Sequence, residues 1–295
     1  MITDGYVPFR GHRTWYEIHG DIGRGTPPLL VLHGGPGVPH DYLTDLAHLS
    51  DDGRPVVFYD QLGCGRSDRP DDDRLWVFDT FVDELVTVRR HLGLDRVHIL
   101  GHSWGGWLAL EYALRARTQQ GLASLVLAST CPSLPKFAIV TRALKALLPA
   151  DVQEALDRHE REGTTDSEEY QAASFAYVTR YLYRREPIPE NVMNAEAEQN
   201  RHLYDLMQGP EWNVTGTIKD WDVTDRLGEI VVPTLVTSGR YDEMTTAIVE
   251  PLVEGIRDSE WVVFDNSAHL AMSEEPERYR EIVGEFLGRA DRAQA

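Results

Sequence analysis

The amino-acid sequence predicts an α/β fold in which a mostly parallel, eight-stranded sheet carries helices on both faces. Most of the predicted strands are continuous runs dominated by Val, Leu and Ile, such as residues 122–128, with no alternation of apolar and polar residues. Such runs indicate strands that are covered on both faces. Segments with helical spacing separate the strands, which is typical of a parallel, doubly wound sheet. One long stretch without a strand pattern predicts a helical insertion.

The first half of the chain contains six of the eight predicted strands. They are expected at residues 5–10, 13–19, 27–33, 56–60, 97–100 and 122–128. The first two strands form a hairpin. Helices are expected at residues 81–91 and 107–115, where apolar residues recur with helical spacing.

The second half begins with the insertion and then returns to alternating strands and helices. Helices of the insertion are expected at residues 137–148, 151–161, 171–183 and 191–207. The remaining elements are expected to be strands at 233–237 and 261–264, helices at 248–256 and 276–287, and a frayed tail at 289–295. Because the sheet needs its last two strands to cover its core, we expect one core, residues 1–131 and 218–295, interrupted by a helical cap at 132–217.

Composition limits the classes of partner. The chain has 295 residues, 42% of them hydrophobic, and a formal net charge of −19. This charge would repel the phosphates of nucleic acids and anionic membranes, so we expect neither as a partner. Two cysteines, Cys64 and Cys131, are too few for a disulfide framework and are expected to be buried thiols. Without metal-ligand spacing, a signal peptide or an apolar run of about 18 residues, we expect no metal, no cofactor and a cytoplasmic location.

Residues 101–105 carry the most specific motif in the chain. They read Gly-His-Ser-Trp-Gly, which matches G-x-S-x-G, and they lie between a predicted strand and a predicted helix. This is the context of a nucleophile elbow, a strained turn that projects the serine side chain from the edge of a sheet. The glycines are needed because Cβ atoms there would collide with the neighbouring strand and helix. Ser103 is therefore the predicted nucleophile.

A serine nucleophile needs a base, and the base needs a carboxylate that orients it. In a sheet with this elbow the chain order is Ser, then Asp or Glu, then His. Asp242 follows the strand at 233–237, and His269 follows the strand at 261–264. Both lie at the carboxyl ends of strands, where ligands bind in open α/β sheets, so we predict that they complete a triad. The alternative carboxylates are Glu243, Asp265 and Asp60, of which Asp60 is better explained as structural.

Acyl transfer also needs donors for the oxyanion of the tetrahedral intermediate. The backbone N–H of Trp104, directly after the nucleophile, is one candidate. The second is expected from the glycine-rich loop at residues 33–37, where the N–H of Gly35 is our candidate. A plain tight turn is the alternative interpretation of that loop.

Several segments together resemble a known family. They are His33-Gly34-Gly35-Pro36-Gly37, Asp60-Gln61-Leu62-Gly63-Cys64-Gly65-Arg66-Ser67, Gly101-His102-Ser103-Trp104-Gly105-Gly106, Gly216-Thr217-Ile218-Lys219-Asp220-Trp221 and Gly239-Arg240-Tyr241-Asp242-Glu243. They closely resemble the proline iminopeptidase family of α/β-hydrolases, which includes prolyl and broader aminopeptidases and L-amino-acid amidases. The resemblance covers residues ~1–130 and ~209–295 and is weak across the cap.

The resemblance implies an α/β-hydrolase fold and removal of an N-terminal aminoacyl group from a peptide, an amide or an aminoacylated small molecule. It also implies that carboxylates hold the free α-ammonium of the substrate, and a cation in a desolvated pocket must indeed be paired. By similarity these carboxylates are Glu243 and Glu211, although the segment around Glu211 is one residue shorter than the Gly-Pro-Asn-Glu-Phe usual in the family. Most of the aromatic residues of the cap are expected to form its core, and some to line an acyl or leaving-group pocket: Phe137, Phe175, Tyr177, Tyr181, Tyr183 and Trp212.

Three functional hypotheses remain open at this point. The first is a serine aminopeptidase or amidase whose substrate is a small molecule or short peptide with a free amine. The second is a carboxylesterase that acts on neutral esters with the same triad. The third is a ligand-binding protein that kept the fold without turnover, which an intact Ser, Asp and His disfavours. Dehalogenases and epoxide hydrolases are disfavoured because they carry Asp at the elbow, where this chain has Ser103. Acyl preference, the leaving group and the oligomeric state do not follow from the sequence.

Overall fold

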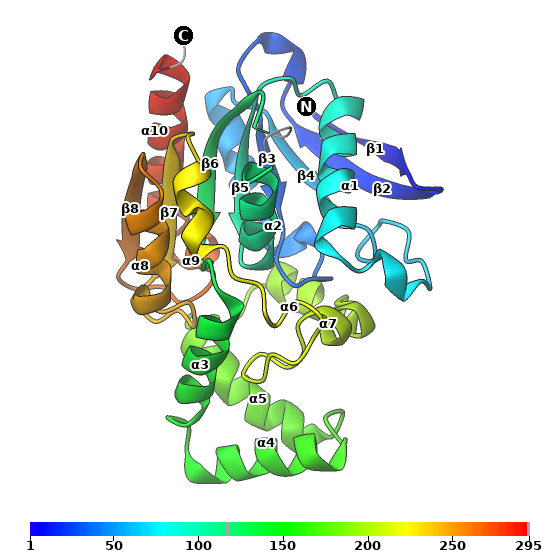
Figure 1. Ribbon diagram of the computed structural model, residues 1–295, viewed down its shortest axis with the longest axis vertical. Coiled ribbons are helices and arrows are strands. Elements are labelled where there is room, and N and C mark those ends of the chain that lie inside the picture. The colour runs from blue at the N-terminus through cyan, green and yellow to red at the C-terminus, as the bar shows by residue number, and fades with distance from the viewer. Residues whose placement is uncertain (116–118, 294–295) are drawn as a thin grey trace.

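The computed structural model describes residues 1–115 and 119–293, which include one eight-stranded sheet (Figure 1). The strands lie side by side in the order β1-β2-β4-β3-β5-β6-β7-β8. The pairs β1–β2 and β2–β4 are antiparallel, and the five other pairs are parallel. The strand bounds are β1 Ile2–Phe9, β2 His12–His19, β3 Leu29–Leu32, β4 Val56–Tyr59, β5 Val97–His102, β6 Leu122–Ala128, β7 Thr234–Gly239 and β8 Ser259–Phe264. The predicted fold class and all eight predicted strands are confirmed.

Two hydrophobic clusters cover the two faces of the sheet. Successive side chains of a strand point to opposite faces. Leu30 and Leu32 of β3 accordingly pack in one cluster, and Leu29 and Val31 in the other. The first cluster includes residues of α1 (Phe78–His91), α2 (Trp104–Ala113), α8 (Thr246–Gly255) and the 3₁₀ helix η4 (Thr224–Glu229). The second includes residues of the 3₁₀ helix η2 (His40–Asp52), α9 (Ala271–Glu274) and α10 (Pro276–Ala293). Two short 3₁₀ helices, η1 (Ile22–Arg24) and η3 (Asp73–Leu75), lie in loops.

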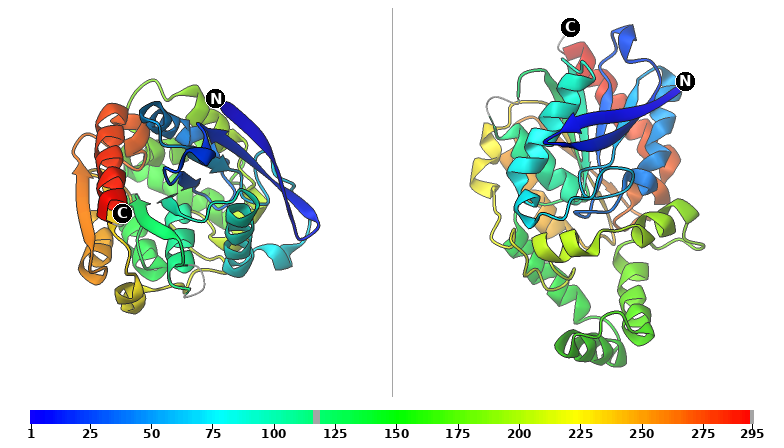
Figure 2. Two further views of the ribbon diagram at one scale, coloured as in Figure 1. Left: turned by 90° about the horizontal axis from the view of Figure 1, so that it is seen from above. Right: turned by 90° about the vertical axis from the view of Figure 1, so that its right-hand side faces the viewer.

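Five helices follow β6 and extend away from the sheet (Figures 1 and 2). They are α3 (Leu134–Lys145), α4 (Ala150–Glu162), α5 (Glu168–Tyr181), α6 (Glu190–Ala197) and α7 (Arg201–Met207). We call this segment the helical insertion. It lies against the loops that follow β3, β7 and β8, because backbone hydrogen bonds join it to Gly37, Glu243 and His269. A third hydrophobic cluster, which includes Leu156 and Tyr177, lies within the insertion.

Two expectations for local structure were wrong. The single helix expected at 191–207 is two helices, α6 and α7. The helix is interrupted at Asn200, whose side chain caps α7 by accepting from the N–H of Leu203. The backbone N–H of Asn200 donates to the carbonyl of Gly37 and not to a carbonyl of α6. The tail is not frayed up to Ala293, because Asp291 of α10 is paired with Arg54; residues 294–295 lie outside the described part.

Phe175 is an exception among the cap aromatics, because it is 53% exposed. It lies on the outer face of α5, whereas Tyr177 of the same helix is buried. Both cysteines are buried free thiols, as expected. Within residues 1–115 and 119–293, no helix combines the length and the apolar character that a membrane span requires.

Candidate active site

Ser103 occupies a strained turn between β5 and α2. Its φ of 55° and ψ of −121° are backbone angles that L-residues rarely adopt, and such strain persists only where the surroundings enforce it. The surroundings are tight. A Cβ added at Gly101 would lie 2.2 Å from the carbonyl oxygen of Gly105, and one added at Gly105 would lie 2.1 Å from that of Leu32. Both positions therefore need glycine for the turn to form.

Asp242 and His269 contact each other at the carboxyl ends of β7 and β8. The Nδ1 of His269 lies 2.8 Å from Oδ1 of Asp242, which also accepts from the backbone N–H of Met244 at 2.8 Å. Both side chains are buried. Burial lowers the pKa of His269, but the charge and the hydrogen bond of Asp242 raise it more, so the net shift is upward from 6.5. An imidazole with this partner can accept a proton and hold it as a stabilised imidazolium.

His102 joins Ser103 to His269 and to the loop after β3. Its ring centroid lies 4.7 Å from that of His269, and its Nε2 donates to the backbone carbonyl of His269 at 2.9 Å. Its Nδ1 accepts from the hydroxyl of Tyr42 at 2.8 Å, and that hydroxyl accepts from the N–H of Gly34 at 2.7 Å. Burial lowers the pKa of His102 far below its usual range, which matches a neutral ring with one donating and one accepting nitrogen. His102 therefore fixes three parts of the site relative to one another.

The two expected oxyanion donors, Trp104 and Gly35, belong to segments that flank or follow the nucleophile turn and the strand β3. Trp104 is the first residue of α2, so geometry leaves its N–H without an acceptor inside the helix. Gly35 has a φ of 113°, and a Cβ there would lie 2.5 Å from the nitrogen of Gly37. Gly34, next to it, lies against the nucleophile, because a Cβ added there would lie 3.3 Å from Cβ of Ser103.

A pair of carboxyl groups lies beside Asp242. Glu243 is 1% exposed, and its Oε2 accepts from the hydroxyl of Tyr177 at 3.0 Å. Burial and the adjacent carboxyl of Glu211 raise the pKa of Glu243 well above its usual range. Glu211 comes from the loop after α7 and accepts from the hydroxyl of Tyr204. The two glutamates, expected to act together, therefore lie together.

Two of the alternative carboxylates, Asp265 and Asp60, are engaged with other partners than His269. Asp265 pairs with Arg240 on the surface, at 2.7 Å. Asp60 is buried, and its Oδ1 lies 2.8 Å from Nδ1 of His40 while its Oδ2 accepts from the N–H of Arg66. Asp60 thus ties two loops together.

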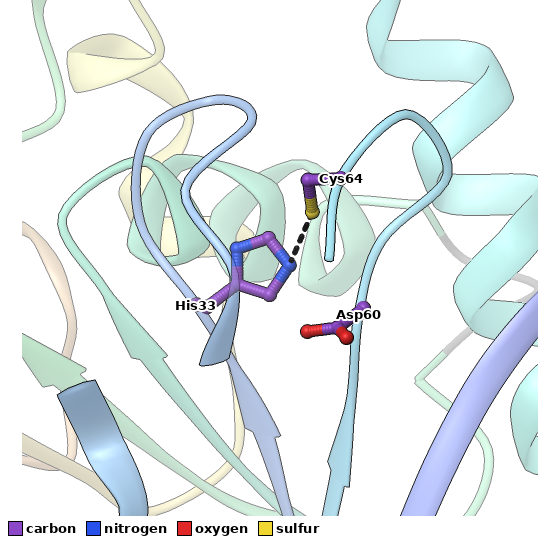
Figure 3. A group of neighbouring side chains, drawn as sticks. All are labelled: His33, Asp60 and Cys64. Carbon is purple, nitrogen blue, oxygen red and sulfur yellow. Dashed lines mark hydrogen bonds between the residues drawn. The ribbon is translucent and has the colours of Figure 1, made fainter. Parts of the chain in front are cut away.

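His33, Asp60 and Cys64 form a buried group whose residue types could bind a metal (Figure 3). Their donor atoms are already engaged within the protein. The Nε2 of His33 accepts from the N–H of Gln61 at 2.9 Å, and the thiol of Cys64 donates to the carbonyl of Gln61 at 3.2 Å. Burial raises the pKa of Cys64 well above its usual range, so this thiol keeps its proton. The group is explained as a brace for the loop that follows β4.

Sequence reasoning did not assign an orienting role to the residues that hold the expected site residues in place. These are Tyr42 and His102 near the nucleophile, Gln61, whose Oε1 accepts from the indole N–H of Trp104 at 2.8 Å, and Tyr177, Tyr204 and Gln208 around the two glutamates. His102 lies inside the G-x-S-x-G motif, and from the sequence it was expected only to pack into the elbow. The tyrosines carry no such signal, since they lie in helices where aromatic residues usually form the core.

Comparison with known proteins agrees with this geometry. A family model described as the alpha/beta hydrolase fold matches residues 27–276. The proline iminopeptidase of Heyndrickxia coagulans is 43% identical over 289 residues, which cover 97% of this chain and 99% of the relative. The crystal structure of VinJ superposes with a TM-score of 0.94 at 40% identity, covering 98% of this chain and 99% of VinJ. The crystal structure of the proline iminopeptidase of Mycobacterium smegmatis gives 0.90 at 37% identity, covering 99% and 100%.

The fold, the elbow and the family model define the chain as an α/β hydrolase. Within that fold the chain belongs to the proline iminopeptidase family. It is therefore an enzyme, a serine aminopeptidase that removes N-terminal residues. The esterase hypothesis is less supported, because the relatives that match over nearly the full chain carry the aminopeptidase name.

Proposed function

We propose that Ser103, His269 and Asp242 carry out this activity through an acyl-enzyme. Ser103 attacks the carbonyl carbon of the first residue of the substrate while His269 takes the hydroxyl proton. His269 then gives that proton to the leaving amine, and water releases the acyl group by the same route in reverse. Asp242 holds Nδ1 of His269 and stabilises the imidazolium, a role supported by their 2.8 Å contact.

The backbone N–H groups of Gly35 and Trp104 hold the oxyanion in this proposal. Negative charge develops on the carbonyl oxygen when Ser103 attacks, and preorganised donors stabilise it without reorganising. Removal of one such donor typically costs ~2.7–4 kcal/mol in other hydrolases, so the loop at residues 33–37 contributes strongly to the rate.

The carboxyl pair of Glu243 and Glu211 carries the proposal for the substrate class. Two carboxylates in contact at a buried site repel each other unless a proton or a cation lies with them. The α-ammonium of a substrate supplies that cation and pairs with both. Glu243 directly follows Asp242 in the chain, so an ammonium held there lies close to the reacting carbonyl. The substrate is then a short peptide or a small molecule with a free N-terminal amine.

The relatives named proline iminopeptidase make an N-terminal proline the first acyl group to test. We further propose that residues 132–217 form a cap on a core made of residues 1–131 and 218–295, which the separate hydrophobic cluster of the insertion supports. Two buried free cysteines support a cytoplasmic location, and the net charge of −19 disfavours nucleic acid and anionic membranes as partners.

A hydrolysis panel tests the proposal. Pro, Ala, Leu and Phe p-nitroanilides are compared with their N-acetylated counterparts, and Ser103→Ala is the control. The expected result is release of p-nitroaniline from free-amine substrates only, with none above background from the Ser103→Ala variant. Equal rates on acetylated substrates would refute the ammonium site. Among p-nitrophenyl esters, a preference for acyl groups without an amine over aminoacyl groups with a free amine would favour the carboxylesterase.

A further inference from the structure

Glu274 of α9 connects the helical insertion to the loop that carries His269. Its side chain is buried, with 3% of the residue exposed, and both carboxylate oxygens accept backbone N–H groups. Oε1 accepts from Arg184, just after α5, at 2.7 Å, and Oε2 accepts from Ala268 at 2.6 Å. The carbonyl of Glu274 also accepts from the guanidinium of Arg185 at 2.8 Å. The side chain of Glu274 therefore accepts hydrogen bonds from Arg184 and Ala268, which are 84 residues apart in the sequence.

The same end of α5 is bonded to both site loops. The N–H of His269 donates to the carbonyl of Leu182 at 3.1 Å, and the N–H of Glu243 donates to the carbonyl of Tyr181 at 3.3 Å. The hydroxyl of Tyr177, one turn earlier in α5, reaches Glu243. The position of the His269 imidazole thus depends on the contacts that hold the end of α5, and Glu274 provides the charged side chain among them.

We propose that Glu274 is a positioning residue, which holds the end of α5 against the His269 loop and thereby sets the placement of His269. Ala268 directly precedes His269, so a bond to its N–H restrains the backbone from which the imidazole projects. Displacement of a catalytic group by about 1 Å can cost roughly a hundredfold in rate. A buried negative charge nearby also favours an imidazolium over a neutral ring.

The charges around this group agree with that role. Burial lowers the pKa of His269, whereas Asp242 and, to smaller extents, Glu211 and Glu274 raise it. The groups that face Glu274 are Arg184 and Arg185 after α5, Tyr183 beside them, and Asp242 in the loop after β7. Loss of the Glu274 charge should therefore lower the pKa of His269.

The test compares Glu274→Gln with Glu275→Gln. Glu275 is the matched control because it lies next to Glu274 and bonds the same loop, at the N–H of Asn266 and the hydroxyl of Ser267. With the p-nitroanilide that the wild type cleaves fastest, kcat and KM are measured from pH 5 to 9. For E274Q we expect kcat to fall roughly tenfold with KM within about threefold, and the acid limb of kcat/KM to move down by about half a pH unit. For E275Q we expect kcat within about threefold and no movement of that limb.

An E274Q variant that matches E275Q in both kcat and acid limb would overturn the inference. Circular dichroism melting first shows that each variant folds. If E274Q does not fold, E274D is measured, since it keeps the charge but is too short to span both N–H groups. Its kcat should fall while the acid limb stays in place, and a wild-type kcat would overturn the inference.

The inference rests on the proposed role of His269, so His269→Ala is measured alongside. An active H269A variant would refute the proposed triad itself. An inactive H269A variant together with an unaffected E274Q variant would refute only the role of Glu274.

Discussion

Glu84 lies in the middle of α1 and is completely buried. Its Oε1 accepts from the hydroxyl of Thr14 and from the N–H of Leu62 at 2.8 Å, whereas its Oε2 is buried without a partner among the described residues. Burial raises the pKa of Glu84 from 4.5 to about 8. Leu62 belongs to the loop that carries Gln61, so the carboxyl of Glu84 helps to hold that loop in place. The free energy of unfolding should therefore depend on the protonation of Glu84.

The raised pKa of Glu84 determines how the stability of the protein changes with pH. Below pH 4.5 the carboxyl is protonated in both the folded and the unfolded chain, so it causes no pH dependence there. Above that pH the unfolded chain releases the proton while the folded protein keeps it, so stability falls as pH rises towards 8. A shift from 4.5 to about 8 corresponds to a loss of about 2 kcal/mol at pH 6 and about 4 kcal/mol at pH 8. Between these two pH values the change is therefore about 2 kcal/mol.

Urea unfolding of the wild type and of Glu84→Gln, at pH 6 and pH 8, measures this difference. The amide has the shape of the protonated acid and cannot ionise, so E84Q should become more stable relative to the wild type by about 2 kcal/mol between pH 6 and pH 8. Exposed Glu254 of α8 gives the matched control, Glu254→Gln, for which we expect no such difference. A relative stability of E84Q that stays constant within about 0.5 kcal/mol would show that Glu84 ionises normally and that the reasoning is wrong.

Three further predictions concern the site. Asp242→Asn should lower kcat by about 10³–10⁴-fold, as a pH–rate profile would show. In the wild type the acid limb of kcat/KM should lie above pH 6.5, because Asp242 raises the pKa of His269. In the Asp242→Asn variant the acid limb of any residual kcat/KM should lie at lower pH. Glu243→Gln should raise KM for free-amine p-nitroanilides by about a hundredfold with kcat less affected, and an unchanged KM in steady-state kinetics would contradict the ammonium site. Gly105→Ala should destabilise the protein by roughly 3 kcal/mol or more, because the added Cβ would lie 2.1 Å from the carbonyl oxygen of Leu32. Gly284 in α10 has room for a Cβ, so Gly284→Ala should stabilise the protein by about 0.5–1 kcal/mol. The melting temperatures of the two variants test both predictions.

The strands and the elbow could be predicted because their signals are local. A buried parallel strand is a short apolar run, and a nucleophile elbow needs glycine at Gly101 and Gly105 whatever the rest of the chain does. The break between α6 and α7 could not be predicted, because Asn200 ends one pattern through a bond to Gly37, which is distant in sequence. The exposure of Phe175 could not be predicted either, because composition does not say which face of α5 meets the core.

By itself, the sequence determined the fold class, the family and the residue types at each strand end, since these depend on short patterns and on chain order. Only the tertiary structure decided which groups meet. It brings His269 to Asp242 and not to Asp265 or Asp60, and it brings Glu211, from the loop after α7, to Glu243. It also shows that Glu274 bonds both the end of α5 and the His269 loop. The physical reason is that hydrogen bonds and charge pairs between distant segments depend on packing in three dimensions, which local patterns do not encode.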